Sequence, residues 1–174
     1  DIITPMQFRL LLENADPLMQ PMIAIQGFTG SRPKETRRLV WENIWKRSTS
    51  IEIEPHEAKT RKRRLVERTP ALEAWIESNR LNTGPIWPLS ESAYNKRYYK
   101  LKADLGIFGH NLLRHSFGSY RLAMLENVAK VSLEMGTSEE KIFSSYREVV
   151  EKPEGEEWFS IYPETIESKI IKMA

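Results

Sequence analysis

The sequence predicts a mainly helical protein with one small antiparallel β-sheet near its middle, an α+β domain. Most of the chain carries apolar residues at helical spacing, in stretches bounded by capping residues, proline and glycine. A single segment, residues 50–68, instead alternates apolar and charged residues with a period of two, which is typical of strands. With 174 residues the chain is long enough for one hydrophobic core. We therefore expect one domain over residues 1–174.

The first helix has a clear start signal. Thr4 is a capping residue, Pro5 suits the first helical turn and Gln7 completes a capping box, so we expect a helix from here to about residue 14. A second, mostly apolar helix opens at residues 16–17. Because glycine is a helix breaker, Gly27 and Gly30 are expected to end it.

The strand segment predicts a β-hairpin with a cationic turn. Ile51 and Ile53 alternate with glutamates, and residues 64–67 have the composition of a returning strand. Between these two runs lies the basic stretch 59–64.

The remaining pattern is helical. A short helix is expected at 34–40 and a long loop at 79–90, and further helices are expected at 70–76, 90–105, 111–125, 126–135, 138–149, 154–159 and 166–173. One stripe at helical spacing is expected to face the core, namely Leu122, Leu125, Val128, Ala129, Ser132 and Leu133.

Composition excludes several classes of function. The chain has no cysteine, which excludes disulfides, thiol catalysis and thiolate metal sites. Its three histidines are too few and too scattered to indicate a metal site. No apolar run approaches the roughly 20 residues of a membrane span, and no signal segment is recognisable. Because the chain begins at Asp1 rather than methionine, we expect a fragment of a longer protein.

Charge is unevenly distributed along the chain, although the net charge is only +2. Residues 30–64 contain eleven Lys and Arg against five Glu, a net of +6. Residues 139–167 contain nine Glu against three Lys and Arg, a net of −6. The basic segment suits a polyanion such as DNA, and the alternative is a solvated charged surface.

Four separated elements together indicate a chemistry. They are the segment 29–35, the hairpin lysine Lys59, the segment 110–117, and the segment 135–138 with Tyr146 lying nine residues beyond Thr137. Each element is weak by itself, since most tyrosines are packing residues. Their order and spacing make the combined signal strong.

This combination resembles the tyrosine recombinases, the phage-integrase family. The shared pattern is Gly-x-Arg-x-x-Glu, then a hairpin Lys, then Leu-Arg-His, then Gly-x-Ser, and finally the spaced Tyr. It covers the chain from about Thr4 to Tyr146, and residues 158–163 resemble a bacterial integrase subgroup. The resemblance implies the catalytic-domain fold of that family. It also implies that an N-terminal DNA-clamping domain is missing here and that residues 150–174 form a C-terminal tail.

The resemblance implies a catalytic role for each matching residue. Tyr146 would attack a phosphodiester, and Arg32 and Arg114 would hold its charged oxygens, for which the planar guanidinium is suited. Lys59 would give a proton to the leaving 5′-oxygen, with Lys62 as the alternative. Because the phosphotyrosine bond conserves energy, no ATP, metal or other cofactor is expected.

Other residues are expected to support the site. Arg61, Lys62, Arg63 and Arg64 of the hairpin are predicted to contact DNA phosphates. Glu35 is predicted to hold its segment in place through an ion pair. For His115 two interpretations stay open, a hydrogen-bonding support of the site or a core histidine.

Two family positions are altered. Asn111 stands where the family has His or Lys, with His110 one residue earlier as a candidate replacement. Thr137 stands where the family has His or Trp, and it is also a candidate for the capping box of the helix that carries Tyr146. Losing one donor to a developing oxyanion costs on the order of 10²–10³ in rate, so we expect a slower or tightly regulated enzyme.

The resemblance predicts site-specific DNA recombination or integration by a bacterial cytoplasmic, nucleoid-associated protein of a mobile element. Its partner would be double-stranded DNA, on which the chain would form a tetrameric synapse while staying monomeric when free, without a membrane role. The alternatives are a degenerate domain that binds DNA without cutting it, a relaxing enzyme of the type IB topoisomerase kind, and an acidic-tailed helical interaction domain. The apolar stripe at 166–173 would pack on its own domain or dock on a neighbouring protomer.

Overall fold

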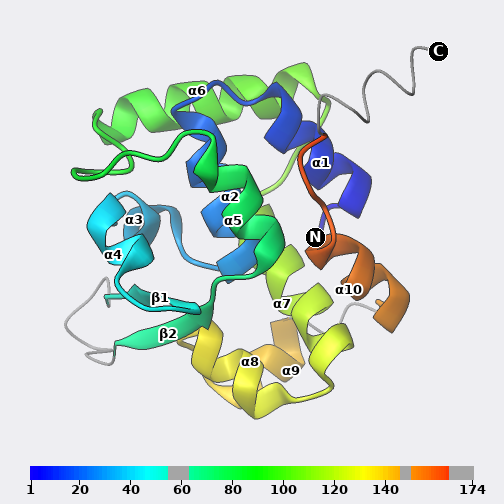
Figure 1. The fold of residues 1–174 in the computed structure, drawn as a ribbon. Helices are drawn as coiled ribbons and strands as arrows, with labels where there is room; N and C mark the ends of the chain where they lie inside the picture. Colours follow the sequence, from blue (N-terminus) through cyan, green and yellow to red (C-terminus); the bar gives the residue numbers. More distant parts are fainter. Residues whose placement is uncertain (55–62, 146–149, 165–174) are drawn as a thin grey trace.

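The protein, described by a computed structural model over residues 1–54, 63–145 and 150–164, is mainly helical with one two-stranded antiparallel sheet (Figure 1), which confirms the predicted α+β class. Its elements in chain order are α1 (Pro5–Asn14), α2 (Met19–Thr29), α3 (Pro33–Thr36), α4 (Trp41–Trp45), β1 (Ser50–Ile53), β2 (Arg64–Glu67), α5 (Pro70–Glu77), α6 (Glu91–Asp104), α7 (Leu112–Leu125), α8 (Val128–Met135), α9 (Glu139–Ser145) and α10 (Lys152–Phe159).

Helix α2 runs through the centre of the molecule (Figure 1). It packs against α1, α5 and α7, and α10 packs against α7 and α1. The hairpin, α8 and α9 lie at one end of the molecule, and α6 lies across the opposite end. Nearly every residue of α2 is buried, which is typical of a helix that is apolar on all sides rather than amphipathic.

The start of α1 is the predicted capping box. The Thr4 hydroxyl accepts a hydrogen bond from the Gln7 backbone N–H at 3.2 Å, and the Gln7 side chain accepts one from the Thr4 N–H at 2.9 Å. The start of α2 is fixed by Asp16, whose carboxylate accepts hydrogen bonds from the backbone of Leu18 and Met19. Both helices therefore begin close to the predicted positions.

Gly27 does not end α2, which corrects the sequence prediction. It lies within the helix, and a Cβ at this position would come within 2.2 Å of the Phe8 ring. The glycine therefore permits α1 to approach α2 closely, and the helix continues to Thr29 before Gly30. Trp158 of α10 also contacts Gly27, because its Nε1 donates a hydrogen bond to the Gly27 carbonyl at 3.0 Å.

Helix α10, within the predicted C-terminal tail, packs into the core. The Trp158 ring stacks between Phe8 of α1, at a centroid distance of 4.2 Å, and Tyr120 of α7, at 4.6 Å. Trp158 is completely buried. Stacked aromatic rings add to the stabilisation from buried area, so residues 152–159 contribute to the domain's stability. The predicted helix at 166–173 lies outside the described residues.

The hairpin has the predicted antiparallel pairing, with Ile51 opposite Val66 and Ile53 opposite Arg64. Ile51, Ile53 and Val66 are buried. Residues 55–62, which contain most of the predicted cationic turn, lie outside the described residues.

Three other sequence predictions need correction. The helix expected at 34–40 spans only Pro33–Thr36, and α4 was not predicted. On α8 the expected core stripe is only partly buried, because Ala129 and Leu133 are exposed. Leu122, Leu125 and Val128 are partly buried and pack against the core. Within the described residues, no helix combines the length and apolar character that a membrane crossing requires.

Candidate active site

A groove of about 560 Å³ lies where α3, α6, α7 and α9 meet. Most of the predicted site residues that the structure describes line it, although they come from three separate parts of the sequence. Its lining consists of Arg32, Pro33, Lys34, Arg37, Glu91, Asn95, Tyr99, Asn111, Arg114, His115, Thr137 and Lys141.

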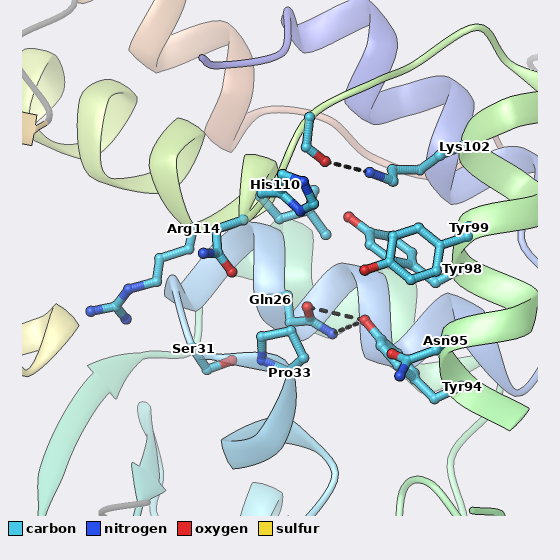
Figure 2. A pocket seen from close by; sticks show the side chains of 13 residues that line it. Gln26, Ser31, Pro33, Tyr94, Asn95, Tyr98, Tyr99, Lys102, His110 and Arg114 are labelled. Atoms are coloured by element: carbon cyan, nitrogen blue, oxygen red, sulfur yellow. Dashed lines mark hydrogen bonds between the residues drawn. The ribbon is translucent and has the colours of Figure 1, made fainter. Parts of the chain in front are cut away.

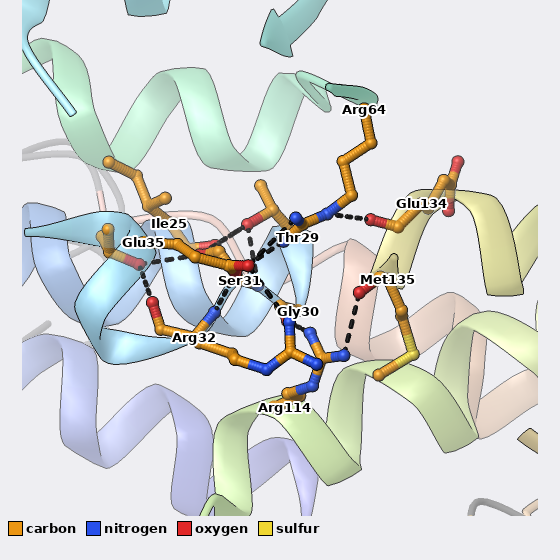
Figure 3. Close-up of polar contacts among 11 residues, drawn as sticks. Ile25, Thr29, Gly30, Ser31, Arg32, Glu35, Arg64, Arg114, Glu134 and Met135 are labelled. Carbon is orange, nitrogen blue, oxygen red and sulfur yellow. Dashed lines mark hydrogen bonds and ion pairs between the residues drawn. The ribbon is translucent and has the colours of Figure 1, made fainter. Parts of the chain in front are cut away.

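Arg114 is held in place by the ends of two helices (Figure 3). Its Nη1 donates to the carbonyl of Gly30, just after α2, at 2.5 Å, and its Nη2 donates to the carbonyl of Met135, the last residue of α8, at 2.8 Å. Carbonyl oxygens at helix C-termini carry partial negative charge and suit a cation. These contacts fix the guanidinium at the groove.

Glu35 holds the segment that carries Arg32 in position through hydrogen bonds (Figure 3). Its carboxylate accepts a hydrogen bond from the Arg32 backbone N–H at 2.7 Å and from Arg32 Nη1 at 3.1 Å. Burial alone would raise the pKa of the Glu35 carboxyl. Hydrogen bonds and charge from Arg64 and Arg32 outweigh burial and hold this pKa below its ordinary value. Glu35 is therefore a carboxylate that positions the segment through ion pairs.

Arg64 is buried, which differs from the predicted contact with DNA. Its Nη2 and Nη1 donate to the Glu35 carboxylate at 2.6 and 3.1 Å, and its Nε donates to the Glu134 carbonyl at 2.8 Å. Only 8% of its side chain is exposed. Arg64 thus joins the hairpin to α3 and α8, because it is the first strand residue after the turn and points inward. Arg63, by contrast, is exposed and forms surface ion pairs with Glu52 and Glu54.

The start of α7 places three candidate residues differently. Asn111, which precedes the helix, adopts a left-handed backbone conformation with φ of 52°, which asparagine tolerates better than most residues. It lines the groove beside Arg114, whereas His110 lines a smaller adjoining pocket. His115 lines the groove, and burial, the N-terminal ammonium group and Arg114 lower its pKa, which favours the neutral imidazole.

Thr137 lines the groove but does not cap α9. The cap is Ser138, whose hydroxyl accepts a hydrogen bond from the Lys141 backbone N–H at 3.3 Å. Thr137 N–H instead donates to the Ser132 carbonyl and Gly136 N–H to the Leu133 carbonyl, which is the Schellman ending of α8. Gly136 has the left-handed φ of 60° that this ending requires. The turn therefore brings the Thr137 side chain to the groove.

Four predicted site residues, namely Lys59, Arg61, Lys62 and Tyr146, lie outside the described residues. Helix α9 is described up to Ser145, the residue before Tyr146.

Sequence reasoning missed several groove residues. Lys34 and Arg37 belong to the basic segment that the charge count found, but no motif singled them out. Lys141 follows Thr137 by four residues, which is one helical turn, and that spacing is a signal that could have found it. Asn95 and Tyr99 of α6 had no sequence signal.

The groove is strongly cationic. Its described lining includes five Lys and Arg side chains and one carboxylate, Glu91, which pairs with Arg37 at 2.8 Å. Such a surface suits a phosphate backbone. Among the described residues, no group of three or more His, Asp and Glu side chains is arranged to hold a metal ion. No model of a known protein family matches the chain, and no curated protein matches it.

Proposed function

We propose that this chain is the catalytic domain of a tyrosine recombinase, which cuts and rejoins duplex DNA through a 3′-phosphotyrosyl bond at Tyr146. One observation carries the proposal. Arg32, Arg114 and Thr137, which the family resemblance selected from three distant segments, line the same groove. A coincidental motif match would not require these segments to meet.

The proposed reaction needs fixed positive charge and a nucleophile. The phenol of Tyr146 loses its proton to solvent, and its oxygen attacks the phosphorus and forms the new O–P bond, while the bond from phosphorus to the 5′-oxygen breaks. The negative charge on the five-coordinate phosphorus meets Arg32 and Arg114. Lys59 transfers a proton to the leaving 5′-oxygen. Attack by the 5′-hydroxyl of another strand reverses the step and rejoins the DNA.

The setting of the two arginines supports this role. Two backbone carbonyls fix the direction of the Arg114 guanidinium at the groove. Arg32 shares the Glu35 carboxylate with Arg64, and 42% of its side chain is exposed at the groove. Preorganised donors are effective in catalysis because they need little rearrangement as charge develops.

A second candidate function is DNA binding without cleavage. It is favoured by Asn111 and Thr137, which line the groove at the two positions where the family carries stronger proton or hydrogen-bond donors. This candidate predicts salt-dependent binding without a covalent adduct.

Covalent trapping separates the two candidates. The protein is mixed with nicked duplexes from the DNA that flanks its gene and is run on a denaturing gel. We expect a slow protein–DNA band that Tyr146→Phe abolishes and that Tyr162→Phe, a change at a half-exposed tyrosine outside the groove lining, leaves unchanged. Duplex binding without any covalent band would favour the second candidate. A band that survives Tyr146→Phe would contradict the assigned nucleophile.

A further inference from the structure

A small pocket adjoins the groove and contains a buried lysine. Its volume is about 120 Å³, roughly the space of four water molecules. Figure 2 shows Lys102, Tyr98 and Tyr99 of α6 facing the segment that carries His110, with the Arg114 guanidinium pointing away from Lys102. Arg114 and Tyr99 line both the pocket and the groove, so the two spaces are neighbours.

Lys102 has no carboxylate partner within the part of the chain that the structure describes. Only 5% of the residue is exposed, and its Nζ donates to the Gly109 carbonyl at 2.6 Å. The same nitrogen lies 5.3 Å from the Tyr98 ring centre and 5.4 Å from that of Tyr99. Those contacts are weaker than an ion pair, and a buried ammonium group is costly when its charge is not compensated.

The pocket lining has the composition of an anion site. Lys102 and Arg114 line it, His110 is exposed at its edge, and no Asp or Glu lines it among the described residues. The tyrosine hydroxyls and Asn95 add neutral hydrogen-bonding groups. Burial lowers the pKa of Lys102, as expected for an ammonium group that lacks a counter-charge.

We propose that this pocket binds a phosphate group, with Lys102 as its main counter-charge, beside the groove and separate from the phosphate at which cleavage is proposed. A tetrahedral oxyanion is of the size that a space of about four waters accepts. Assigning this phosphate to the backbone of bound DNA rests on the proposed function. The binding of a phosphate group by the pocket does not, since a free phosphate or a nucleotide offers the same chemistry.

The first test uses the unaltered protein with ¹⁵N label on its lysine side chains. Inorganic phosphate is added, and the Nζ signals of Lys102 and Lys100 are followed during a pH titration. We expect phosphate to raise the pKa of Lys102, because a bound anion favours the charged form. Lys100, which is exposed and paired with Asp104, serves as the internal control and should not respond. A Lys102 signal that phosphate leaves unchanged would overturn the proposal.

The second test compares Lys102→Met with Lys100→Met on the same helix. We expect Lys102→Met to weaken phosphate binding about 10- to 100-fold, as is typical for losing a hydrogen bond to a charged group. Circular dichroism checks folding, because this variant also loses the bond to Gly109. Equal phosphate affinity in the two variants would overturn the proposal, and the titration of unaltered protein decides the matter if Lys102→Met fails to fold.

Duplex binding at several salt concentrations identifies the source of the phosphate. A DNA phosphate in the pocket predicts that Lys102→Met lowers the slope of log affinity against log salt by about one, and that Lys100→Met does not. An unchanged slope together with phosphate binding would assign the pocket to a free phosphate or nucleotide. If phosphate binds but covalent trapping fails, the phosphate site is supported and the proposed recombinase function is contradicted.

Discussion

Two regions of this protein use arginine in opposite ways. In the frame that joins the hairpin, α3, α7 and α8, arginines are buried against carboxylates. Arg64 meets Glu35, and Arg121, of which 2% of the side chain is exposed, meets Glu134 and Glu67 at 2.7–2.8 Å. At the groove, Arg114 is also nearly buried but is held by two backbone carbonyls.

The difference lies in where each guanidinium is placed. In the frame, the buried arginines bind carboxylates of other elements and so tie these elements together. At the groove, two backbone carbonyls fix the Arg114 guanidinium at a surface that a ligand can reach. The comparison teaches that burial alone does not tell whether an arginine builds the fold or serves a site, because Arg64 and Arg114 are both buried and only Arg114 lines the groove.

The largest effect is expected from breaking the frame at Glu35. Glu35→Gln leaves Arg64 buried beside a neutral amide, and removing one partner of a buried ion pair costs about 3–5 kcal/mol. The measurement is the free energy of unfolding from urea titration. Glu77→Gln, in an exposed pair with Arg80, is the matched control and should change it by less than about 1 kcal/mol.

The pH dependence of the free energy of unfolding tests the Glu35 ion pairs a second time. The pKa of Glu35 is lower in the folded protein than its ordinary value of 4.5. The contribution of Glu35 to the free energy of unfolding is therefore fully present above pH 4.5. It is lost as pH falls through the lower pKa of the folded protein. Glu35→Gln should have a shallower loss of stability on acidification. Equal acid sensitivity in the two proteins would contradict the ion-pair role.

At the groove, Arg114→Gln should act mainly on reaction rate. Removing a fixed donor from a developing oxyanion slows a reaction by about 10²–10³-fold. The measurement is single-turnover formation of the covalent complex at saturating protein, which separates chemistry from binding. Arg80→Gln, a change at a surface arginine outside the groove lining, is the control. If Arg114→Gln reacted as fast as the unaltered protein, the contrast between frame and groove would not hold.

The fold was largely predictable from local signals. Capping residues located the start of α1, and period-two alternation located the hairpin, because these patterns report on hydrogen bonds within a few residues. The role of Gly27 was not predictable. Its reason is the approach of Phe8 from another helix, which local sequence does not contain.

The site was predictable in part, through spacing rather than through local chemistry. Arg32 and Arg114 were found as members of an ordered pattern, and both line the groove. Arg64 was misassigned because a basic run does not reveal which side chain turns inward. Lys102 had no signal at all, since its burial depends on how the loop before α7 folds over α6.

A smaller effect is expected for Lys141, an exposed groove cation. Lys141→Gln should lower the slope of log DNA affinity against log salt by about one, equally for all DNA sequences, because a lysine–phosphate contact carries no sequence information. Lys130→Gln, on the exposed side of α8, is the control and should leave the slope unchanged. If both variants behaved alike, the groove would not be the DNA-binding surface.

The smallest effect is expected for His115, whose pKa responds to the charge of the neighbouring Arg114. Burial, the N-terminal ammonium group and Arg114 lower the pKa of His115 below its ordinary value of 6.5. The unfolded chain therefore takes up a proton near pH 6.5 that the folded protein takes up only at lower pH, so stability falls as pH drops through this window. His115→Gln should reduce the loss of stability on acidification, and His110→Gln, at an exposed position, should not.

DNA binding gives a second measurement at His115. Since a bound phosphate backbone would offset the charge of Arg114, DNA should raise the pKa of His115 and bind with proton uptake. Identical pH profiles for free protein and complex would show that the phosphate backbone does not approach Arg114.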